Sequence, residues 1–174
     1  MTIGVMAWFD EETEERIRLL WRELAALGVP ALGSAAGPHP RPHVSYLYTD
    51  HLDVTATITA LSRLPKRPPL TVRLGAVALF PPRILHLPVI PTTDLLDRHR
   101  SVFDVASGSL ADIRPFHVPG RWSPHVTLAR SVPRGLADVA VETVAAYLPI
   151  EGTLATGGIE DADSGQAWTA STLP

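Results

Sequence analysis

Two short segments of the sequence carry nearly the same tetrapeptide, in which a histidine precedes a hydroxyl residue by two positions. The first segment reads Pro42-His43-Val44-Ser45, and the second reads Pro124-His125-Val126-Thr127. On a β-strand, side chains at positions i and i+2 point to the same face, so each histidine would share a face with its hydroxyl partner. The two segments therefore offer two titratable rings and two hydroxyl groups for chemistry.

Two imidazoles that face each other across a cleft, each beside a hydroxyl group, suit the cleavage of a phosphodiester. One neutral histidine removes a proton from an attacking water and the other protonates the leaving sugar oxygen, because the ordinary histidine pKa lies near working pH. Ser45 and Thr127 would donate hydrogen bonds to the non-bridging phosphate oxygens. The near-symmetry of the motifs leaves the two roles open, and we expect His125 as base and His43 as acid. This chemistry needs neither a metal ion nor a cofactor.

The spacing of histidine and hydroxyl residue is weak evidence by itself, because it arises by chance. His99 and Ser101 show it within a predicted helix, where positions i and i+2 do not share a face. The repeated proline and valine around both motifs make the signal specific. Two other interpretations of His43 and His125 are a zinc site, for which neither motif supplies a carboxylate as third ligand, and strand histidines that neighbouring hydroxyl groups satisfy structurally.

The composition excludes several classes of protein. The chain has 174 residues, which is enough for one domain with a real core. It contains no cysteine, which rules out disulfides, thiolate metal sites and a cysteine nucleophile. Its net charge of −3 argues against broad binding of long nucleic acid but allows a small anionic ligand. Since no apolar stretch approaches the roughly 20 residues of a membrane span, we expect a cytoplasmic protein with no membrane partner.

The elements that must position the two motifs follow from hydrophobic periodicity and turn residues. Helices are expected at residues 10–27, 53–64, 92–106 and 136–148, and strands at 3–9, 42–48, 70–80, 83–90, 124–132, 152–159 and 167–173. The order strand, helix, Pro-rich loop, short strand, helix, strand occurs twice, and each motif histidine follows the start of an expected helix by about 33 residues. We therefore predict a single domain made of two pseudo-repeats, at about 1–80 and 83–174.

With these motifs the sequence resembles the 2H phosphoesterase superfamily, specifically the bacterial 2′-5′ RNA ligase-like (LigT-type) RNA 2′,3′-cyclic phosphodiesterases. The mark of that group is a pair of His-x-Thr/Ser strand motifs in duplicated halves, and the segment His125-Val126-Thr127-Leu128-Ala129-Arg130 is an especially close match. The resemblance covers most of the chain. It implies an α+β fold in which duplicated β-α-β-α-β halves form a bilobal molecule with two antiparallel sheets around a central cleft. It also implies that His43, Ser45, His125 and Thr127 are the catalytic set.

The activity that the resemblance implies is metal-independent hydrolysis of 2′,3′-cyclic phosphate ends or 2′-5′ linkages, with RNA ligation at most a reverse side reaction. We expect a small nucleotide or a short RNA end as partner and no long duplex nucleic acid, since few basic residues border the expected cleft. Two alternatives stay open: a nucleotide-binding module on the same scaffold that turns nothing over, and a cyclic phosphodiesterase of a small non-RNA metabolite. Both motifs are intact, which favours the enzyme.

Further substrate-binding candidates lie near the motifs. Arg130 either reaches the phosphate or pairs with a surface carboxylate. Arg41 and Arg121 are the permanent cations of the Pro- and Gly-rich loops 30–41 and 115–124, which should border the cleft. Trp122 or Phe116 would stack on a base, although packing within the protein is an equally good interpretation of either ring.

The remaining histidines have less to distinguish them. We expect His39, His51 and His99 at the surface. His86 is expected on a strand, and His117 in a loop beside the cleft, where either ring would be near a ligand.

Overall fold

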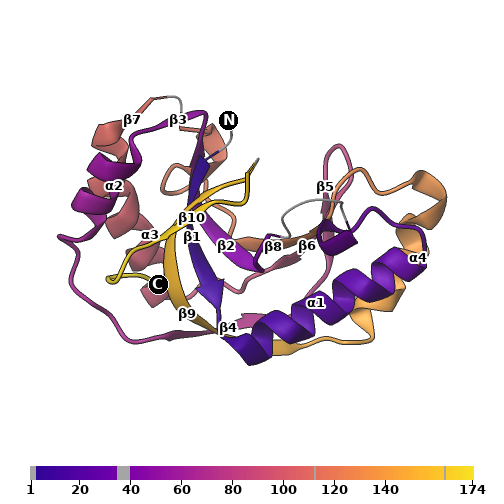
Figure 1. Ribbon diagram of the computed structural model, residues 1–174. Coiled ribbons are helices and arrows are strands. Elements are labelled where there is room, and N and C mark those ends of the chain that lie inside the picture. Colours follow the sequence, from indigo (N-terminus) through magenta and orange to yellow (C-terminus); the bar gives the residue numbers. More distant parts are fainter. Residues whose placement is uncertain (1–2, 35–39, 112, 163) are drawn as a thin grey trace.

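The computed structural model of the protein describes residues 3–34, 40–111, 113–162 and 164–174. The strands form two main antiparallel sheets, as the sequence predicts, and a small pair of strands apart from them (Figure 1). The first sheet has the order β10-β9-β1-β2, with β4 also paired to β9, and the second has the order β5-β6-β8. The first contains β1 (Ile3–Phe9), β2 (His43–Thr49), β4 (Leu70–Leu74), β9 (Ile150–Asp161) and β10 (Ala167–Thr169). The second contains β5 (Ala78–Phe80), β6 (Ile84–Pro88) and β8 (His125–Ala129), and the separate pair is β3 (His51–Leu52) with β7 (Leu110–Ala111).

The described residues form four α-helices: α1 (Glu11–Ala26), α2 (Val54–Leu61), α3 (Thr93–Ala106) and α4 (Ala137–Ala145). The first three contact strands of the sheets, and α4 packs against α1. Short 3₁₀ turns lie between them, at Leu32–Ser34 (η1), Ser107–Ser109 (η2), Pro115–His117 (η3) and Arg134–Leu136 (η4). In Figure 1, α2 and α3 lie together beside the first sheet, whereas α1 and α4 run along the other side of the molecule. Among the described residues, no helix combines the length and the apolar character needed to cross a membrane.

The first strand and helix show why the sequence folds as predicted. β1 is buried along its whole length because it lies between β9 and β2 at the centre of its sheet. The Asp10 side chain accepts a hydrogen bond from the backbone N–H of Thr13 at 2.9 Å and so caps α1, whose first turn is acidic as the helix dipole favours. The apolar stripe of α1, with Trp21 in it, is buried. Trp21 is therefore a core residue.

The first sheet draws on both ends of the chain, whereas the strands of the second sheet all lie between residues 78 and 129. β1, β2 and β4 of the first sheet precede residue 80, whereas β9 and β10 follow residue 149. Two helices also contact a strand from the other part of the chain. The helix α1 precedes β2 in sequence but packs against β8, and α3 precedes β8 but packs against β2. The internal duplication remains a prediction, but the two motif strands are each supported by the helix that precedes the other.

The strand expected at 70–80 is divided in two. β4 ends at Leu74 after pairing with β9 in the first sheet, and β5 begins at Ala78 and pairs with β6 in the second. The chain changes sheets in the intervening segment, which contains Gly75. The residues from Gly75 to Phe80 are all apolar, so the sequence gives no sign of the change. This short connection joins the two sheets beside the motif strands.

Candidate active site

The two motifs lie on strands that meet at the boundary between the sheets. β2 is the edge strand of the first sheet, β8 is the edge strand of the second, and the two contact each other. In both strands the histidine and the hydroxyl residue are half-buried, and the valine between them is buried. His43, Ser45, His125 and Thr127 together line one pocket of about 330 Å³, which we call the histidine pocket. The structure thus brings the four predicted residues together.

Both motif rings are oriented in the same way. Nδ1 of His43 donates to the carbonyl of Arg41 at 2.7 Å, and Nδ1 of His125 donates to the carbonyl of Ser123 at 2.8 Å. Each partner lies two residues before its histidine on the chain. A proton held on Nδ1 in this way leaves the lone pair of the neutral ring on Nε2. Each ring therefore has one nitrogen fixed to the backbone and one free for proton transfer.

Burial is the main cause of a lowered pKa in both rings, since it disfavours the charged imidazolium. The hydrogen bonds to Arg41 and Ser123 oppose this effect. The positive charge of Arg130 lowers the pKa of His43 further, and that of His43 lowers the pKa of His125. Because each positive charge disfavours the next, the pocket favours one neutral ring beside one protonated ring over two protonated rings.

The groups next to the two rings differ. Nε2 of His43 lies 3.4 Å from the hydroxyl of Tyr48. The ring of His125 instead stands edge-on to Phe80, with centroids 5.0 Å apart, and to His86, with centroids 5.2 Å apart. His86 stacks on Phe80 at 3.7 Å and donates from Nδ1 to the carbonyl of Ile84 at 3.2 Å. One proposed proton-transfer group thus has a hydroxyl neighbour and the other has aromatic neighbours.

Tyr48 was not predicted at this site, and a β-bulge explains why. Met6 of β1 pairs with Ser45 and the adjacent Val5 pairs with Leu47, so Tyr46 is an extra residue in β2. Strict alternation would turn Tyr48 away from the face of Ser45, but the bulge returns its side chain to the histidine pocket. No local sequence signal marks this change of register.

The other substrate-binding candidates fall in different places. Arg130 lines the histidine pocket, and within the described residues it pairs with no carboxylate. Arg41, Arg121 and Trp122 are not among the residues that line this pocket. Arg41 instead forms an ion pair with Glu14 at 2.6 Å. The structure therefore does not place Arg41 in the pocket as a cation. Although Arg41 is close to the first motif in sequence, the buried carboxylate of Glu14 binds its guanidinium.

Trp122 supports the site from behind. Its indole N–H donates to the carbonyl of Ser45 at 2.9 Å, and its ring stacks on His99 with centroids 3.9 Å apart. The ring is packed within the protein, so we assign Trp122 a structural role in place of stacking on a base. Phe116, the other aromatic candidate, does line the pocket, with 54% of its surface exposed.

The remaining histidines divide between surface and interior. His51 is exposed as expected, and His39 lies outside the described residues. His99 was expected at the surface but is only 2% exposed, because it falls on the stripe of α3 that contains Leu95 and Val102. Its Nε2 donates to the carbonyl of His117 at 2.9 Å. His117 lines the histidine pocket, in agreement with its expected place beside the cleft.

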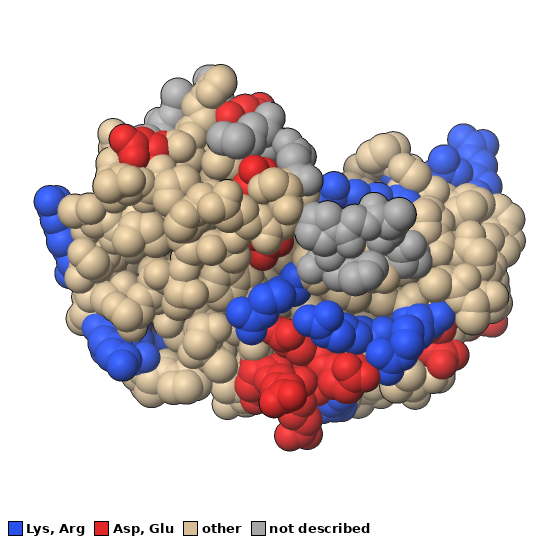
Figure 2. All heavy atoms as spheres, in the orientation of Figure 1, with Lys and Arg blue, Asp and Glu red and all other residues tan. Residues whose placement is uncertain are grey.

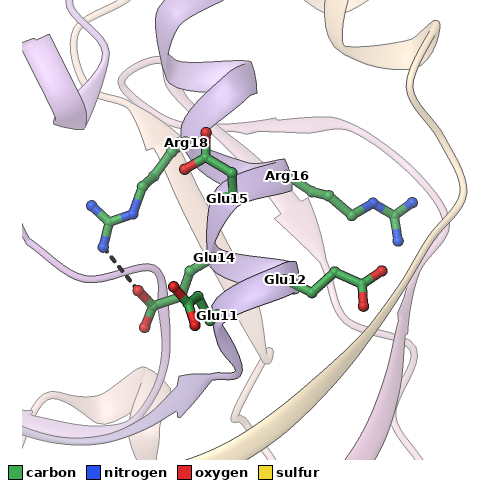
Figure 3. Close-up of a pocket in the computed structure, with 6 residues that line it drawn as sticks. All are labelled: Glu11, Glu12, Glu14, Glu15, Arg16 and Arg18. Carbon is green, nitrogen blue, oxygen red and sulfur yellow. Dashed lines mark hydrogen bonds and ion pairs between the residues drawn. The ribbon is translucent and has the colours of Figure 1, made fainter.

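A larger hollow lies along the start of α1, and its chemistry differs. It is lined only by residues of that helix, four glutamates together with Arg16 and Arg18 (Figure 3). Glu14 is ion-paired with Arg18 at 2.8 Å and also with Arg41. In Figure 2 these carboxylates and arginines form a mixed charged surface over α1. The hollow is a solvated, charge-paired helix face with no histidine, so we place the chemistry in the histidine pocket.

The part of the chain that the structure describes contains no group of three or more His, Asp or Glu placed to hold a metal ion. The zinc interpretation of His43 and His125 would require such a third ligand. The arrangement instead offers two motif rings, three hydroxyl residues and two arginines around one space: His43 and His125, Ser45, Tyr48 and Thr127, and Arg114 and Arg130. That set can transfer two protons and hold an anion between them.

Comparison with known proteins gives one family and one fold. A sequence model of the 2′-5′ RNA ligase superfamily matches residues 9–157, which include both motifs. No curated protein sequence matches the chain. Among solved structures, TT0787 of Thermus thermophilus matches with a TM-score of 0.61 and 16% identity, over 98% of each chain.

Two other solved structures share the fold at low identity. LigT of E. coli in apo form matches with a TM-score of 0.59 and 14% identity, over 97% of this chain and 92% of that chain. Usb1 of Kluyveromyces marxianus matches with a TM-score of 0.51 and 12% identity, over 97% of this chain and 96% of that chain. Structures of the E. coli protein complexed with NADP+, ATP and 3′-AMP match as well. All of these structures are similar over nearly the whole chain.

Proposed function

This chain belongs to the 2′-5′ RNA ligase superfamily, and from that premise we propose that it is a metal-independent phosphodiesterase that hydrolyses 2′,3′-cyclic phosphate ends or 2′-5′ linkages of RNA or nucleotides. Family membership confirms the resemblance that the two motifs indicate. The observation that carries the proposal is the matched orientation of His43 and His125. Each ring lines the same pocket and donates from Nδ1 to a carbonyl two residues back, so Nε2 is the nitrogen left for proton transfer.

The proposed reaction uses the two rings in opposite states of protonation. Nε2 of the neutral ring takes a proton from water as the water oxygen bonds to phosphorus. The bond between phosphorus and one ribose oxygen breaks, and the protonated ring gives its Nε2 proton to that oxygen. The products are a phosphomonoester and a free ribose hydroxyl, and the pair of rings has exchanged roles.

Three other groups of the pocket would hold the phosphate during this step. The hydroxyl groups of Ser45 and Thr127 donate to the non-bridging oxygens, whose negative charge must be stabilised in the transition state. The guanidinium of Arg130 is suited to the same oxygens because it has no carboxylate partner among the described residues and can bind in a bidentate manner. The indole of Trp122 fixes the backbone at Ser45 and so positions its hydroxyl.

We assign His125 as base and His43 as acid. The aromatic rings of Phe80 and His86 next to His125 favour its neutral form, which is the form a base needs. The hydroxyl of Tyr48 beside His43 can donate to Nε2 of the neutral ring and accept from Nε2 of the protonated ring. His43 can therefore keep a hydrogen-bond partner in the protonated state that an acid requires.

The proposed partner is a small nucleotide or a short RNA end. The related E. coli protein has been solved with ATP, NADP+ and 3′-AMP, which are all small nucleotides. The pocket of about 330 Å³ is at the lower end of the size that small-molecule sites have. The net charge of −3 argues against the broad basic surface that long duplex nucleic acid requires.

A nucleotide-binding module and a phosphodiesterase of a small non-RNA metabolite are the competing functions. The first has no need for two free Nε2 atoms in one pocket, which favours the enzyme. The second differs only in the group attached to the cyclic phosphate, so substrates distinguish it.

The deciding experiment measures hydrolysis of 2′,3′-cyclic AMP and of a short RNA with a 2′,3′-cyclic end, in EDTA. Wild type is compared with His43→Ala and His125→Ala, and with His51→Ala as a control at an exposed histidine outside the pocket. We expect turnover in EDTA that either pocket variant abolishes and the control retains. Full activity in either pocket variant contradicts the two-histidine mechanism, and tight nucleotide binding without turnover favours the binding module. Turnover of non-nucleotide cyclic phosphates alone favours the metabolite enzyme.

A further inference from the structure

One wall of the histidine pocket has no part in the proposed proton transfers. It is formed by Arg114, Phe116 and His117, around the 3₁₀ turn η3, and we call it the η3 wall. The backbone N–H of Arg114 donates to the carbonyl of Tyr48 at 3.3 Å, and the carbonyl of His117 accepts from Nε2 of His99. The wall is thus attached to β2 and to α3, and its side chains have fixed places beside the motifs.

Phe116 presents an aromatic ring at the mouth of the pocket. More than half of its surface is exposed, and it is the next residue after the Pro115 that opens η3. A nucleobase is the natural partner for such a ring, because every base has a flat π-face and stacking tolerates any base. Since the pocket itself is only about 330 Å³, a ring at its rim meets a part of the substrate beyond the reacting group.

Arg114 supplies a second cation to the pocket, apart from Arg130. Its guanidinium lies 5.7 Å from the ring centroid of Tyr48 and 3.5 Å from a carboxylate oxygen of Asp50. Both partners of that ion pair are partly exposed, so the pair is weak and its partner is easily exchanged. Arg130 already lies next to the motifs, where the scissile phosphate would bind, so Arg114 is available to a second phosphate.

His117 adds an unused polar group to the same wall. The rings of His43, His86, His99 and His125 each donate to a backbone carbonyl. The buried ring of His117 is different, because neither of its nitrogens has a hydrogen-bond partner. Its ring centroid lies 4.8 Å from that of Phe116. His117 therefore packs against Phe116 within the wall and supports that ring beside the pocket.

From these three residues we infer that the η3 wall is the subsite for the second-last nucleotide of the substrate, which precedes the nucleotide that carries the cyclic phosphate. Its base stacks on Phe116, and Arg114 binds the phosphate that links it to the last nucleotide. The inference rests on the proposed function and narrows it: the substrate is the 3′ end of an oligonucleotide with at least two phosphates, in preference to a mononucleotide. The second phosphate is the link between the two last nucleotides.

The test compares a mononucleoside 2′,3′-cyclic phosphate with a dinucleotide that ends in the same group. We expect wild type to have a higher kcat/KM for the dinucleotide by about tenfold, as one stacked base and one ionic contact allow. Phe116→Ala removes most of this preference through KM, and Phe116→Trp restores it. Arg114→Gln weakens the preference and its dependence on salt. Tyr147→Ala and Arg63→Gln remove an exposed aromatic ring and an exposed cation elsewhere and should change neither substrate.

Calorimetric binding makes the test independent of turnover. The ligands are 3′-AMP and the dinucleotide ApA with a 3′-phosphate, and the proteins are the same set. We expect the dinucleotide to bind about tenfold more tightly to wild type and equally with the mononucleotide to Phe116→Ala. Equal affinities in wild type, or an equal loss for both ligands in Phe116→Ala, overturn the subsite while leaving the proposed reaction standing. Tighter dinucleotide binding without any hydrolysis supports the subsite and contradicts the proposed reaction.

Discussion

The strands β2 and β8 carry the same histidine motif in two different environments. Both histidines donate from Nδ1 to the carbonyl two residues back, and both are followed by a buried valine and a half-buried hydroxyl residue. Beyond this core the strands differ. The hydroxyl of Tyr48 faces His43, whereas the rings of Phe80 and His86 surround His125.

The shared features and the different ones have separate physical origins. The carbonyl partner and the hydroxyl residue lie within two positions of each histidine, so strand geometry alone provides them. The neighbours come from further away: a bulge in β2 brings in Tyr48, and the adjacent strands β5 and β6 bring Phe80 and His86. We infer that the local part makes each ring able to transfer a proton and that the distant part decides which role it takes.

The largest effect should come from separating the two roles with the leaving group. A p-nitrophenyl phosphodiester needs no general acid, because nitrophenolate leaves without a proton. We expect His43→Ala to lower kcat/KM by about 10³-fold on a cyclic nucleotide, and by much less on the nitrophenyl substrate. His125→Ala should lose a similar factor on both, since the base is still required. Steady-state kinetics with both substrates provides the measurement.

Two results would change the comparison. Recovery in His125→Ala instead of His43→Ala would exchange the roles of acid and base. Recovery in neither variant would mean that the surroundings of the rings do not divide the roles at all. His51→Ala should match wild type with both substrates, because this exposed residue lies outside the pocket.

The hydroxyl groups should show the second largest effect, and here the two strands should behave alike. Ser45→Ala and Thr127→Val each remove one donor to the phosphate oxygens. We expect each to lower kcat by about 10²-fold, with a smaller change in KM, because the bond strengthens in the transition state. Thr127→Ser retains the hydroxyl and should keep most of the activity.

A strong difference between the two hydroxyl variants would contradict this symmetry. It would show that one hydroxyl alone contacts the phosphate. The Ser45 side is the more constrained of the two, since Trp122 donates to the carbonyl of that residue. Trp122→Phe then serves as a control, because it keeps an aromatic ring at this position and removes the indole N–H donor.

The same division between local and distant features explains what the sequence predicts. The motif residues of both strands, the helix that Asp10 caps and the two-sheet fold follow from local patterns or from the family resemblance. Tyr48 does not, because the bulge that turns it into the pocket depends on pairing with β1. Arg114 lies eleven residues before His125 and belongs to neither motif, and only the fold shows that it reaches the pocket.

The errors have the same cause. Arg41 precedes the first motif by two residues, but Glu14 of α1 binds its guanidinium outside the pocket. Trp122 precedes the second motif, yet its ring packs on His99 of α3. Nearness in sequence suggested both as ligands of the substrate, whereas their partners come from elements far along the chain. The burial of His99 was within reach of sequence analysis, since its spacing from Leu95 matches the buried stripe of α3.

A third ring tests what the carbonyl partner does for the two motif rings. Burial lowers the pKa of His117 to about 3, helped by the positive charges of His125 and His99, while the Tyr46 carbonyl opposes this without closing a hydrogen bond. The unfolded chain takes up a proton at this residue below about pH 6.5, whereas the folded chain does not. Above about pH 6.5 the ring is neutral in both states and does not reduce the free energy of unfolding. As the pH falls below that value, protonation of the unfolded chain alone reduces the free energy of unfolding progressively. At pH 5 the loss is about 2 kcal/mol.

His117→Phe removes this titrating group and keeps a ring in its place. We expect the free energy of unfolding to fall less between pH 7 and pH 5 in the variant than in wild type, by about 2 kcal/mol. Urea unfolding at the two pH values measures the difference, and His51→Ala should leave it unchanged because that ring is exposed. An unchanged slope in His117→Phe would mean that water or another group satisfies the ring in solution. His117 would then have a hydrogen-bond partner as the two motif rings do.

The smallest effect should come from the hydroxyl that distinguishes His43. Because Nδ1 of this ring donates to a carbonyl, the neutral ring can only accept at Nε2, and the Tyr48 hydroxyl donates to it there. The same hydroxyl can accept from Nε2 of the protonated ring, and a hydrogen bond to the charged form is the stronger of the two, so Tyr48→Phe should lower the pKa of His43. If His43 is the acid, activity falls as the pH rises through that pKa, and the alkaline limb of the kcat/KM profile moves to lower pH by up to about one unit.

Phe80→Leu is the matched change on the other strand, since it removes the ring that stands edge-on to His125. It should move the acidic limb, which belongs to the base, and leave the alkaline limb in place. The activity near neutral pH changes by only a few fold in either variant, so the position of the limbs carries the information. If Tyr48→Phe moves the acidic limb instead, His43 is the base. The two environments would still divide the roles, but in the opposite direction.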